Sequence, residues 1–259
     1  MPPMTSTEPV GLRAQKKLET RQAISDHATR LFIERGFDAT TIADIASAAR
    51  VAKMTVTNYF PRKEDLALDH ADAFVASLAG TVAARSPGQS AVAALHDAFR
   101  EALATRNPVL GFSGRPFARM VAESTVLVAR LRELHEKREE ALAELLAAEA
   151  REAGGGRPGA GRTGEAGPSG ADELTPYLAA AQIGGVHRAL FQELQRRSVA
   201  GESEESIAAA VAPAAEAAFA QLTRALGDYA VRPQPPAAAD GADKEADKEA
   251  DEDDEADNS

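Results

Sequence analysis

The chain has 259 residues, a formal net charge of −11 and no cysteine. The lack of cysteine excludes disulfides, thiolate metal sites and cysteine nucleophiles. Apolar residues make up 44% of the chain and aromatic residues 5%. Because alanine favours helices whereas strands favour aromatic and β-branched residues, this composition predicts an all-α fold. No apolar signal segment or bilayer-spanning run is visible in the sequence, so we expect a cytoplasmic protein without membrane contact.

The charge is distributed unevenly along the chain. From Asp240 to the last residue, eleven Asp or Glu stand against two Lys, a net charge of −9 that leaves −2 for all other residues. Residues 1–63 contain ten Lys or Arg and six Asp or Glu, a net charge of +4. This asymmetry indicates an N-terminal segment that could bind nucleic acid.

The N-terminal region is predicted to begin with a disordered arm, residues 1–12, and to continue as a helix over 13–35. The apolar stripe of this helix is Ile24, Ala28, Leu31 and Phe32. Gly36 is placed to end the helix as its C′ residue. A second, short helix is expected after Thr41, which has the capping-box spacing to Asp44.

A third helix is predicted over residues 52–59, after a break at 50–52. Val56 and Phe60 lie four residues apart and are expected to point inward. Pro61 follows where a new helix can begin. Further helices are predicted at 62–84, 89–106, 115–130, 131–152, 172–198 and 203–228, since Pro, Gly and Asn mark the breaks and no segment alternates with period two.

The chain is expected to form two domains, with a flexible loop and a charged tail marked by their composition. An N-terminal domain is expected over 13–66 and a larger helical domain over 67–230. The larger domain would be interrupted by a flexible Gly/Pro-rich loop at 154–171. Residues 231–259 are expected to form a disordered acidic tail. A disordered acidic tail usually only solubilises a protein, but this one could compete with DNA for a basic face.

The second and third helices have the features of a helix-turn-helix, whose second helix reads the major groove. Ala46 is the small residue expected where the helices cross, and Ile45, Ala49, Val51 and Val56 would lock their angle. The outer surface of the third helix would then carry Lys53, Met54, Thr55, Thr57, Asn58 and Tyr59. Lys and Tyr can reach phosphates, Asn can pair with an adenine edge, and Thr can contact phosphate or a thymine methyl. An ordinary amphipathic hairpin is the alternative.

A longer motif favours the helix-turn-helix over an ordinary amphipathic hairpin. Between Arg21 and Leu66 the order is Leu31-Phe32-x-x-x-Gly36-Phe37, Thr40-Thr41-Ile42, Ile45-Ala46, Val51, then Thr55-Val56-x-x-Tyr59-Phe60-Pro61-x-Lys63-Glu64-x-Leu66. This segment closely resembles the DNA-binding domain of the TetR family of transcriptional regulators. The resemblance implies an all-helical homodimer whose N-terminal helices bind an operator and whose remaining helices form a small-molecule pocket and the dimer interface.

By motif position, the resemblance implies phosphate contacts for Thr41, Tyr59 and Lys63. It also implies that Lys53, Met54, Thr55, Thr57 and Asn58 form the surface that reads bases and backbone. Three positions depart from the usual family pattern. Arg50 stands where Gly is common and adds positive charge near the DNA backbone, Ala52 stands where a capping Ser is common, and Thr57 stands where Tyr is common. Arg13, Lys16, Lys17 and Arg21 form either a solvated helix end or a basic arm that contacts DNA.

The resemblance further implies an effector pocket among the middle helices. Candidate lining residues are Phe74, His96, Phe99, Phe112, Phe117 and Met120, with Arg119 and His135 nearby. Two apolar stripes in the last long helices are assigned to the dimer interface: Ile183, Val186, Leu190 and Leu194, and then Val211, Ala218 and Leu222. The alternative is that these stripes cover the core of their own subunit.

Other functional classes are less well supported by the sequence. Residues 156–163 approach a phosphate-binding loop, but a helix precedes them where such a loop needs a strand. The five histidines show no metal-binding spacing, and we expect neither an enzyme nor a metal or other cofactor. The main prediction is a homodimeric repressor released from a palindromic operator in double-stranded DNA by an unknown small-molecule effector. The alternative is an adaptor whose acidic tail binds a partner, with weak non-specific DNA binding.

Overall fold

The computed structural model describes residues 10–155 and 170–233, which fold into helices joined by short connections. The helices are α1 (Val10–Arg35), α2 (Ile42–Ala48), α3 (Lys53–Tyr59), α4 (Lys63–Ala67), α5 (Ala71–Ala83), α6 (Ala91–Ala104), the 3₁₀ turn η1 (Pro108–Leu110), α7 (Gly114–Glu123), α8 (Thr125–Gly155), α9 (Gly170–Ala200) and α10 (Glu204–Leu226). Within these residues the only strand-like pairing is an isolated bridge between Ser90 and Val231. The all-α prediction is therefore confirmed. None of the described helices is both long and apolar enough to cross a membrane.

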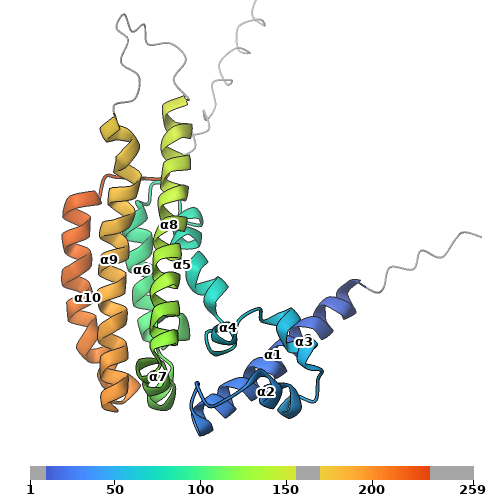
Figure 1. The fold of residues 1–259 in the computed structure, drawn as a ribbon. Helices are drawn as coiled ribbons and strands as arrows, with labels where there is room; N and C mark the ends of the chain where they lie inside the picture. Colours follow the sequence, from blue (N-terminus) through green and yellow to red (C-terminus); the bar gives the residue numbers. More distant parts are fainter. Residues whose placement is uncertain (1–9, 156–169, 234–259) are drawn as a thin grey trace, which may run out of the picture.

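Figure 1 shows α1–α3 set to one side of a bundle formed by α5, α6, α8, α9 and α10, with α4 between the two parts. The small N-terminal part has its own apolar core, in which Ile24, Phe32, Ile45, Val56 and Phe60 are almost completely buried. These are the positions that helical periodicity predicted to face inward.

The N-terminal core continues into the bundle. Met120 and Val121 of α7 and Leu127 of α8 belong to the same buried cluster as the residues of α1–α4. Arg130 of α8 also donates a hydrogen bond to Asp65 of α4 at 2.8 Å. The two parts are thus joined by apolar packing and by an ion pair.

Three helix boundaries differ from the sequence predictions. The helix α1 begins at Val10, so residues 10–12 are helical rather than part of an irregular arm. The expected helix at 62–84 is two helices, α4 and α5, separated at 68–70. The break predicted between 130 and 131 lies instead at Ser124, whose backbone is extended and whose buried hydroxyl accepts a hydrogen bond from the amide of Leu127 at 3.4 Å.

The end of the described chain is also more ordered than the prediction of a tail from residue 231. The amide of Gly88 donates to the carbonyl of Arg232 at 2.8 Å, and the amide of Arg232 donates to the carbonyl of Gln89 at 3.0 Å. This short segment therefore fastens the end of α10 to the α5–α6 connection. The helix α10 runs from Glu204 to Leu226 with Pro213 inside it. The acidic residues from Asp240 onward and the Gly-rich segment 156–163 lie outside the described residues.

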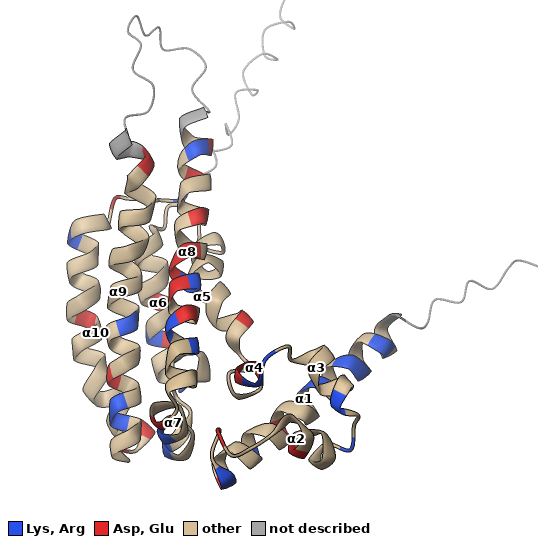
Figure 2. Cartoon of the chain, viewed as in Figure 1, with Lys and Arg blue, Asp and Glu red and all other residues tan. Residues whose placement is uncertain are grey.

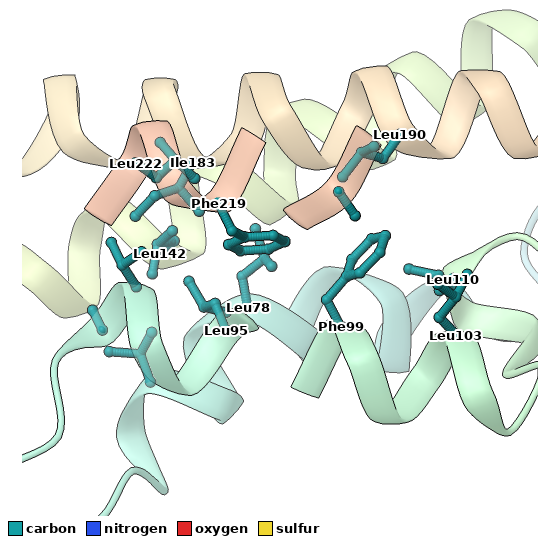
Figure 3. Close-up of a cluster of buried hydrophobic side chains, with 14 of the residues drawn as sticks. Leu78, Leu95, Phe99, Leu103, Leu110, Leu142, Ile183, Leu190, Phe219 and Leu222 are labelled. Carbon is teal, nitrogen blue, oxygen red and sulfur yellow. The ribbon is translucent and has the colours of Figure 1, made fainter. Parts of the chain in front are cut away.

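The residues assigned to the dimer interface require a correction. Ile183, Leu190, Leu194, Val211 and Leu222 are buried inside the subunit, in one cluster with residues of α5, α6 and α8. In Figure 3, Ile183, Leu190 and Leu222 lie among Phe99, Leu142 and Phe219. Val186 and Ala218 are half-buried. These stripes cover the core of their own subunit because α9 and α10 pack on α6 and α8 with their most apolar faces, and a partner could contact only the opposite faces.

Candidate nucleic-acid interface

The helix α2 begins with a complete capping box. The hydroxyl of Thr41 accepts a hydrogen bond from the amide of Asp44 at 3.2 Å, and the Asp44 carboxylate accepts from the amide of Thr41 at 2.9 Å and from its hydroxyl at 2.6 Å. The hydrogen bond from the Thr41 hydroxyl lowers the pKa of Asp44 below its usual value. Thr41 is exposed, so its hydroxyl oxygen lies at the surface, where the resemblance placed a phosphate contact.

The turn between α2 and α3 reverses the chain with a left-handed residue. Arg50 has a φ of 54°, a conformation that costs a non-glycine residue about 1–2 kcal/mol. The amide of Arg50 donates to the carbonyl of Ser47 at 3.2 Å, and the amide of Val51 donates to the carbonyl of Ala46 at 3.0 Å. The turn keeps its shape without the usual glycine, and the exposed guanidinium of Arg50 adds a positive charge beside α3.

The helix α3 is anchored on one face and presents the other to solvent. Val56 within the helix and Phe60 just after it are buried. On the outer face Lys53 and Asn58 are exposed, and the side chain of Met54 is 70% exposed. Thr55, Thr57 and Tyr59 are half-buried on the flanks of this face. All six predicted contact residues of α3 therefore retain accessible surface on one short helix, as major-groove reading requires.

Two basic residues near α3 are fixed by contacts within the N-terminal part. The guanidinium of Arg21 lies 4.7 Å from the centre of the Phe60 ring and donates to the carbonyl of Asp69 at 3.2 Å. Lys63 places its ammonium 4.2 Å from the centre of the Phe37 ring and 3.5 Å from the carbonyl oxygen of Asp38. Arg21 is thus a packing residue rather than part of an arm. Lys63, which was expected to contact phosphate, is half-buried and fixed beside the α1–α2 connection.

Basic side chains gather around this surface. Figure 2 shows Lys and Arg along the first turns of α1 and at the start of α3. Arg13, Lys16 and Lys17 are exposed on α1, and α3 contains no acidic residue. Because phosphate contacts supply most of the affinity of proteins for DNA, this arrangement suits binding to a polyanion.

An open cleft of about 620 Å³ separates α7 from the α1–α2 connection. The cleft is lined by Arg35, Phe37 and Asp38 on one side and by Arg115 and Arg119 on the other. It lies where the N-terminal part meets the bundle, and Met120, one of the predicted pocket residues, is also on its wall.

The six predicted pocket residues do not come together at one site. Phe99 and Phe112 belong to the main core of the bundle, whereas Phe74 lies in a separate small cluster with Leu134 and Phe191. Met120 and Phe117 pack against the N-terminal core. His96 stacks on Phe219 with a centroid distance of 4.6 Å and pairs with Glu216 at 3.1 Å. Helical periodicity places aromatic residues inside the bundle but does not determine which cluster each one joins.

Two polar residues on the inner stripes of α8 and α9 were not predicted from the sequence. Arg138 lies four residues from both Leu134 and Leu142 on the inner stripe of α8, and His187 lies four residues from both Ile183 and Phe191 on the inner stripe of α9. Both are buried. A charged or polar residue within an apolar helical stripe was the signal that could have identified them.

Comparisons with known proteins agree with this geometry. Residues 24–69 match the family model described as bacterial regulatory proteins, tetR family. The HTH-type transcriptional regulator TcmR of Streptomyces glaucescens is 31% identical over 143 residues, which are 53% of this chain and 63% of TcmR.

Among solved structures, native NalD of Pseudomonas aeruginosa, the secondary repressor of the MexAB-OprM multidrug efflux pump, aligns over 80% of this chain and 96% of its own, with 20% identity and a TM-score of 0.48. FadR of Bacillus subtilis, solved in complex with stearoyl-CoA, aligns over 79% of this chain and 98% of its own, with 16% identity and a TM-score of 0.43. The family match covers the helix-turn-helix described above, from the buried Ile24 of α1 to Asp69 after α4. On the matched segment and the regulator relative together, the chain is similar to bacterial regulatory proteins of the TetR family, and the similarity to the family model lies in residues 24–69.

Proposed function

We propose that this protein is a sequence-specific DNA-binding transcriptional regulator that acts as a homodimeric repressor in the cytoplasm. The observation that carries the proposal is the outer face of α3, on which Lys53, Thr55 and Asn58 are accessible while Val56 and Phe60 hold the helix from behind. Such a face can enter the major groove, with Asn58 able to pair with an adenine edge and Lys53 able to reach a phosphate.

Selection of bound sequences from a random pool of double-stranded DNA tests this proposal. The full chain is compared with a Thr55→Ala/Asn58→Ala variant and with a Glu140→Ala/Glu144→Ala variant. The two glutamates are exposed on α8, away from α3, and serve as the matched control. We expect a palindromic consensus for the full chain and for the control, and none for the α3 variant. If the full chain enriched no sequence and bound DNA only at low salt, the regulator proposal would fail and the adaptor alternative would be favoured.

The proposed dimer uses the outward faces of α9 and α10. Leu178, Ala181 and Ala217 are exposed there, and Gly185 is half-buried. A Cβ added to Gly185 would meet no atom within 4 Å, so the fold of the subunit itself does not require glycine at this position. A small residue facing solvent in the middle of a long helix is suited to the close approach of a partner helix, and two-fold pairing would place two α3 helices on one palindrome.

A Gly185→Leu variant tests the dimer surface. A Cβ at this position meets no atom of the subunit within 4 Å, and leucine favours helix more than glycine does, so the variant should fold. We expect analytical ultracentrifugation to show a monomer, or a dimer weakened at least tenfold. The control is Ala129→Leu, an exposed position on α8. A Gly185→Leu variant that remained as dimeric as the control would rule out this face.

The last part of the proposal is that binding of a small molecule releases the protein from its operator. The bundle is joined to the reading helices through the packing of Leu127 on the N-terminal core and through the Arg130–Asp65 ion pair. An effector acts only if it binds two arrangements of the subunits with different affinity. Ligand titration of the protein on its selected operator measures that difference directly.

A further inference from the structure

The bundle contains a buried positive charge, that of Arg138, for which the described residues supply no counter-charge. The Arg138 side chain of α8 is 6% exposed, and its Nε is buried without a hydrogen-bond partner. Among the described residues no carboxylate forms an ion pair with Arg138, whereas the other buried arginine, Arg85, is bound by Glu149 through two hydrogen bonds of 2.8 Å. The two arginines therefore differ: Arg85 has a carboxylate partner among the described residues, and Arg138 has none there.

The surroundings of Arg138 do not offset its burial. Its guanidinium lies 4.6 Å from the centre of the Phe74 ring, and such a contact contributes up to about 2 kcal/mol when desolvated. Burying an ion costs several kcal/mol, which is more than this contact returns. Desolvation accordingly lowers the pKa of Arg138 to about 10, so the group is still charged at neutral pH.

Two neutral imidazoles share this region with Arg138. His135 and His187 are 8% and 5% exposed, and neither ring nitrogen of His187 has a hydrogen-bond partner. Burial, with a further contribution from the charge of Arg138, lowers the pKa of His135 to about 4 and that of His187 well below its usual value. Each ring is therefore uncharged near pH 7, and His187 has an N–H donor and a nitrogen acceptor available to a bound molecule.

Aromatic rings enclose these polar groups. His135 lies edge-on to Phe74 and Phe191, with centroid distances of 4.9 and 5.0 Å. His187 lies edge-on to Phe99 and Phe219, at 5.8 and 5.5 Å. The rings come from α5, α6, α9 and α10, and Figure 3 shows Phe99 and Phe219 turned toward the interior of the bundle. An apolar surround with one cation and a few hydrogen-bonding groups is typical of a small-molecule site.

We propose that the effector is a small planar apolar acid whose carboxylate pairs with Arg138 and whose body lies among the Phe rings of the bundle. This inference rests on the proposed function in placing the effector in the bundle. The pairing would supply the counter-charge that the described fold does not, and a guanidinium can bind a carboxylate through two parallel hydrogen bonds. His187 would donate or accept a further hydrogen bond and so orient the molecule. Because Arg138 is on the same helix as Arg130, binding there acts on the helix that holds α4.

Direct binding to the purified full chain tests the inference without DNA. The probes are benzoate and 2-naphthoate, each with its uncharged amide, followed by calorimetry and by the shift in Tm. The variant Arg138→Met removes the charge and keeps the side-chain length, and Arg100→Met is the matched control because Arg100 is exposed on α6. We expect at least one acid to bind the unaltered chain and the control, its amide to bind much more weakly, and Arg138→Met to bind the acid about a hundredfold more weakly.

The Tm of the ligand-free Arg138→Met variant distinguishes lost binding from a failure to fold. If the charge of Arg138 has no partner in the ligand-free protein, Arg138→Met should raise the Tm of that protein, as replacement of buried ions by apolar residues often does. A lowered Tm would show that Arg138 has a structural partner and would overturn the inference. So would equal binding of acid and amide, undiminished binding by Arg138→Met, or binding of neither acid to the unaltered chain. Operator binding that persisted alongside any of these results would leave the proposed function standing.

Discussion

The N-cap of α3 offers a sharp test of the local energetics. Ala52 is the N-cap of α3, with φ −70° and ψ 146°, and its side chain makes no capping hydrogen bond. Ser90 and Ser203 cap α6 and α10 with nearly the same backbone angles, φ −79° and ψ 157° and φ −68° and ψ 151°. In both, the serine hydroxyl accepts a hydrogen bond of 3.2 Å from the amide three residues on.

The substitution Ala52→Ser should therefore form the missing cap without moving the backbone. Ala52 is exposed, so the hydroxyl displaces no packed atom. The amide of Thr55, three residues on like those of Ala93 and Ser206 in the reference caps, already donates to the carbonyl of Ala52 at 2.8 Å and would share its hydrogen with the new hydroxyl. A serine cap in place of alanine stabilises a helix by about 1 kcal/mol. In a chain of this size that corresponds to a rise in Tm of about 2–4 °C.

Thermal unfolding and amide exchange measure the effect. The matched control is Ala129→Ser, an exposed alanine inside α8. There serine lowers helix propensity and should reduce stability by about 0.5 kcal/mol, so the two substitutions have opposite signs. Exchange should also slow at the amides of Met54 and Thr55. An Ala52→Ser protein with an unchanged or lowered Tm would refute the reasoning that this N-cap is preformed and merely lacks its hydroxyl.

Three further predictions concern ionisable groups. Burial holds the pKa of His187 well below 6.5, so below that pH the unfolded chain takes up a proton that the folded chain excludes. The free energy of unfolding should then fall by about 1.4 kcal/mol per pH unit. The variant His187→Phe should flatten the decline of Tm on acidification. Asp65→Asn removes the carboxylate that Arg130 holds at 2.8 Å and should cost about 2 kcal/mol; if a double-mutant cycle with Arg130→Met gave purely additive effects, no coupling would exist. The pKa of Asp44 is lowered by its hydrogen bond from Thr41, so the stabilisation is present above the unfolded pKa and lost as pH falls through the folded one, and the Tm difference between the unaltered chain and Thr41→Ala should shrink in acid.

Much of the N-terminal part could be predicted from the sequence because its contacts are local. Ile24, Val56 and Phe60 are spaced by helical periodicity, and the Thr41–Asp44 capping box depends on residues three apart. A helix presents residues four apart on one face whatever lies elsewhere in the fold. The face of α3 that carries Lys53 and Asn58 followed from the same periodicity, since Val56 had to be inside.

The tertiary structure alone decided which apolar stripe meets which neighbour. The sequence shows that Ile183, Leu190 and Leu222 share faces of two helices, but a stripe that packs on its own bundle and one that packs on a partner have the same period. The structure shows these residues buried against α6 and α8, so the stripes pack on their own bundle. The same holds for Arg138. Its place in the stripe of α8 can be read from the sequence. The absence of a carboxylate beside it in the described fold depends on which side chains α5, α6, α9 and α10 bring to it. A buried charge is compensated by residues that are distant in the chain and close in space, and only the tertiary structure shows these.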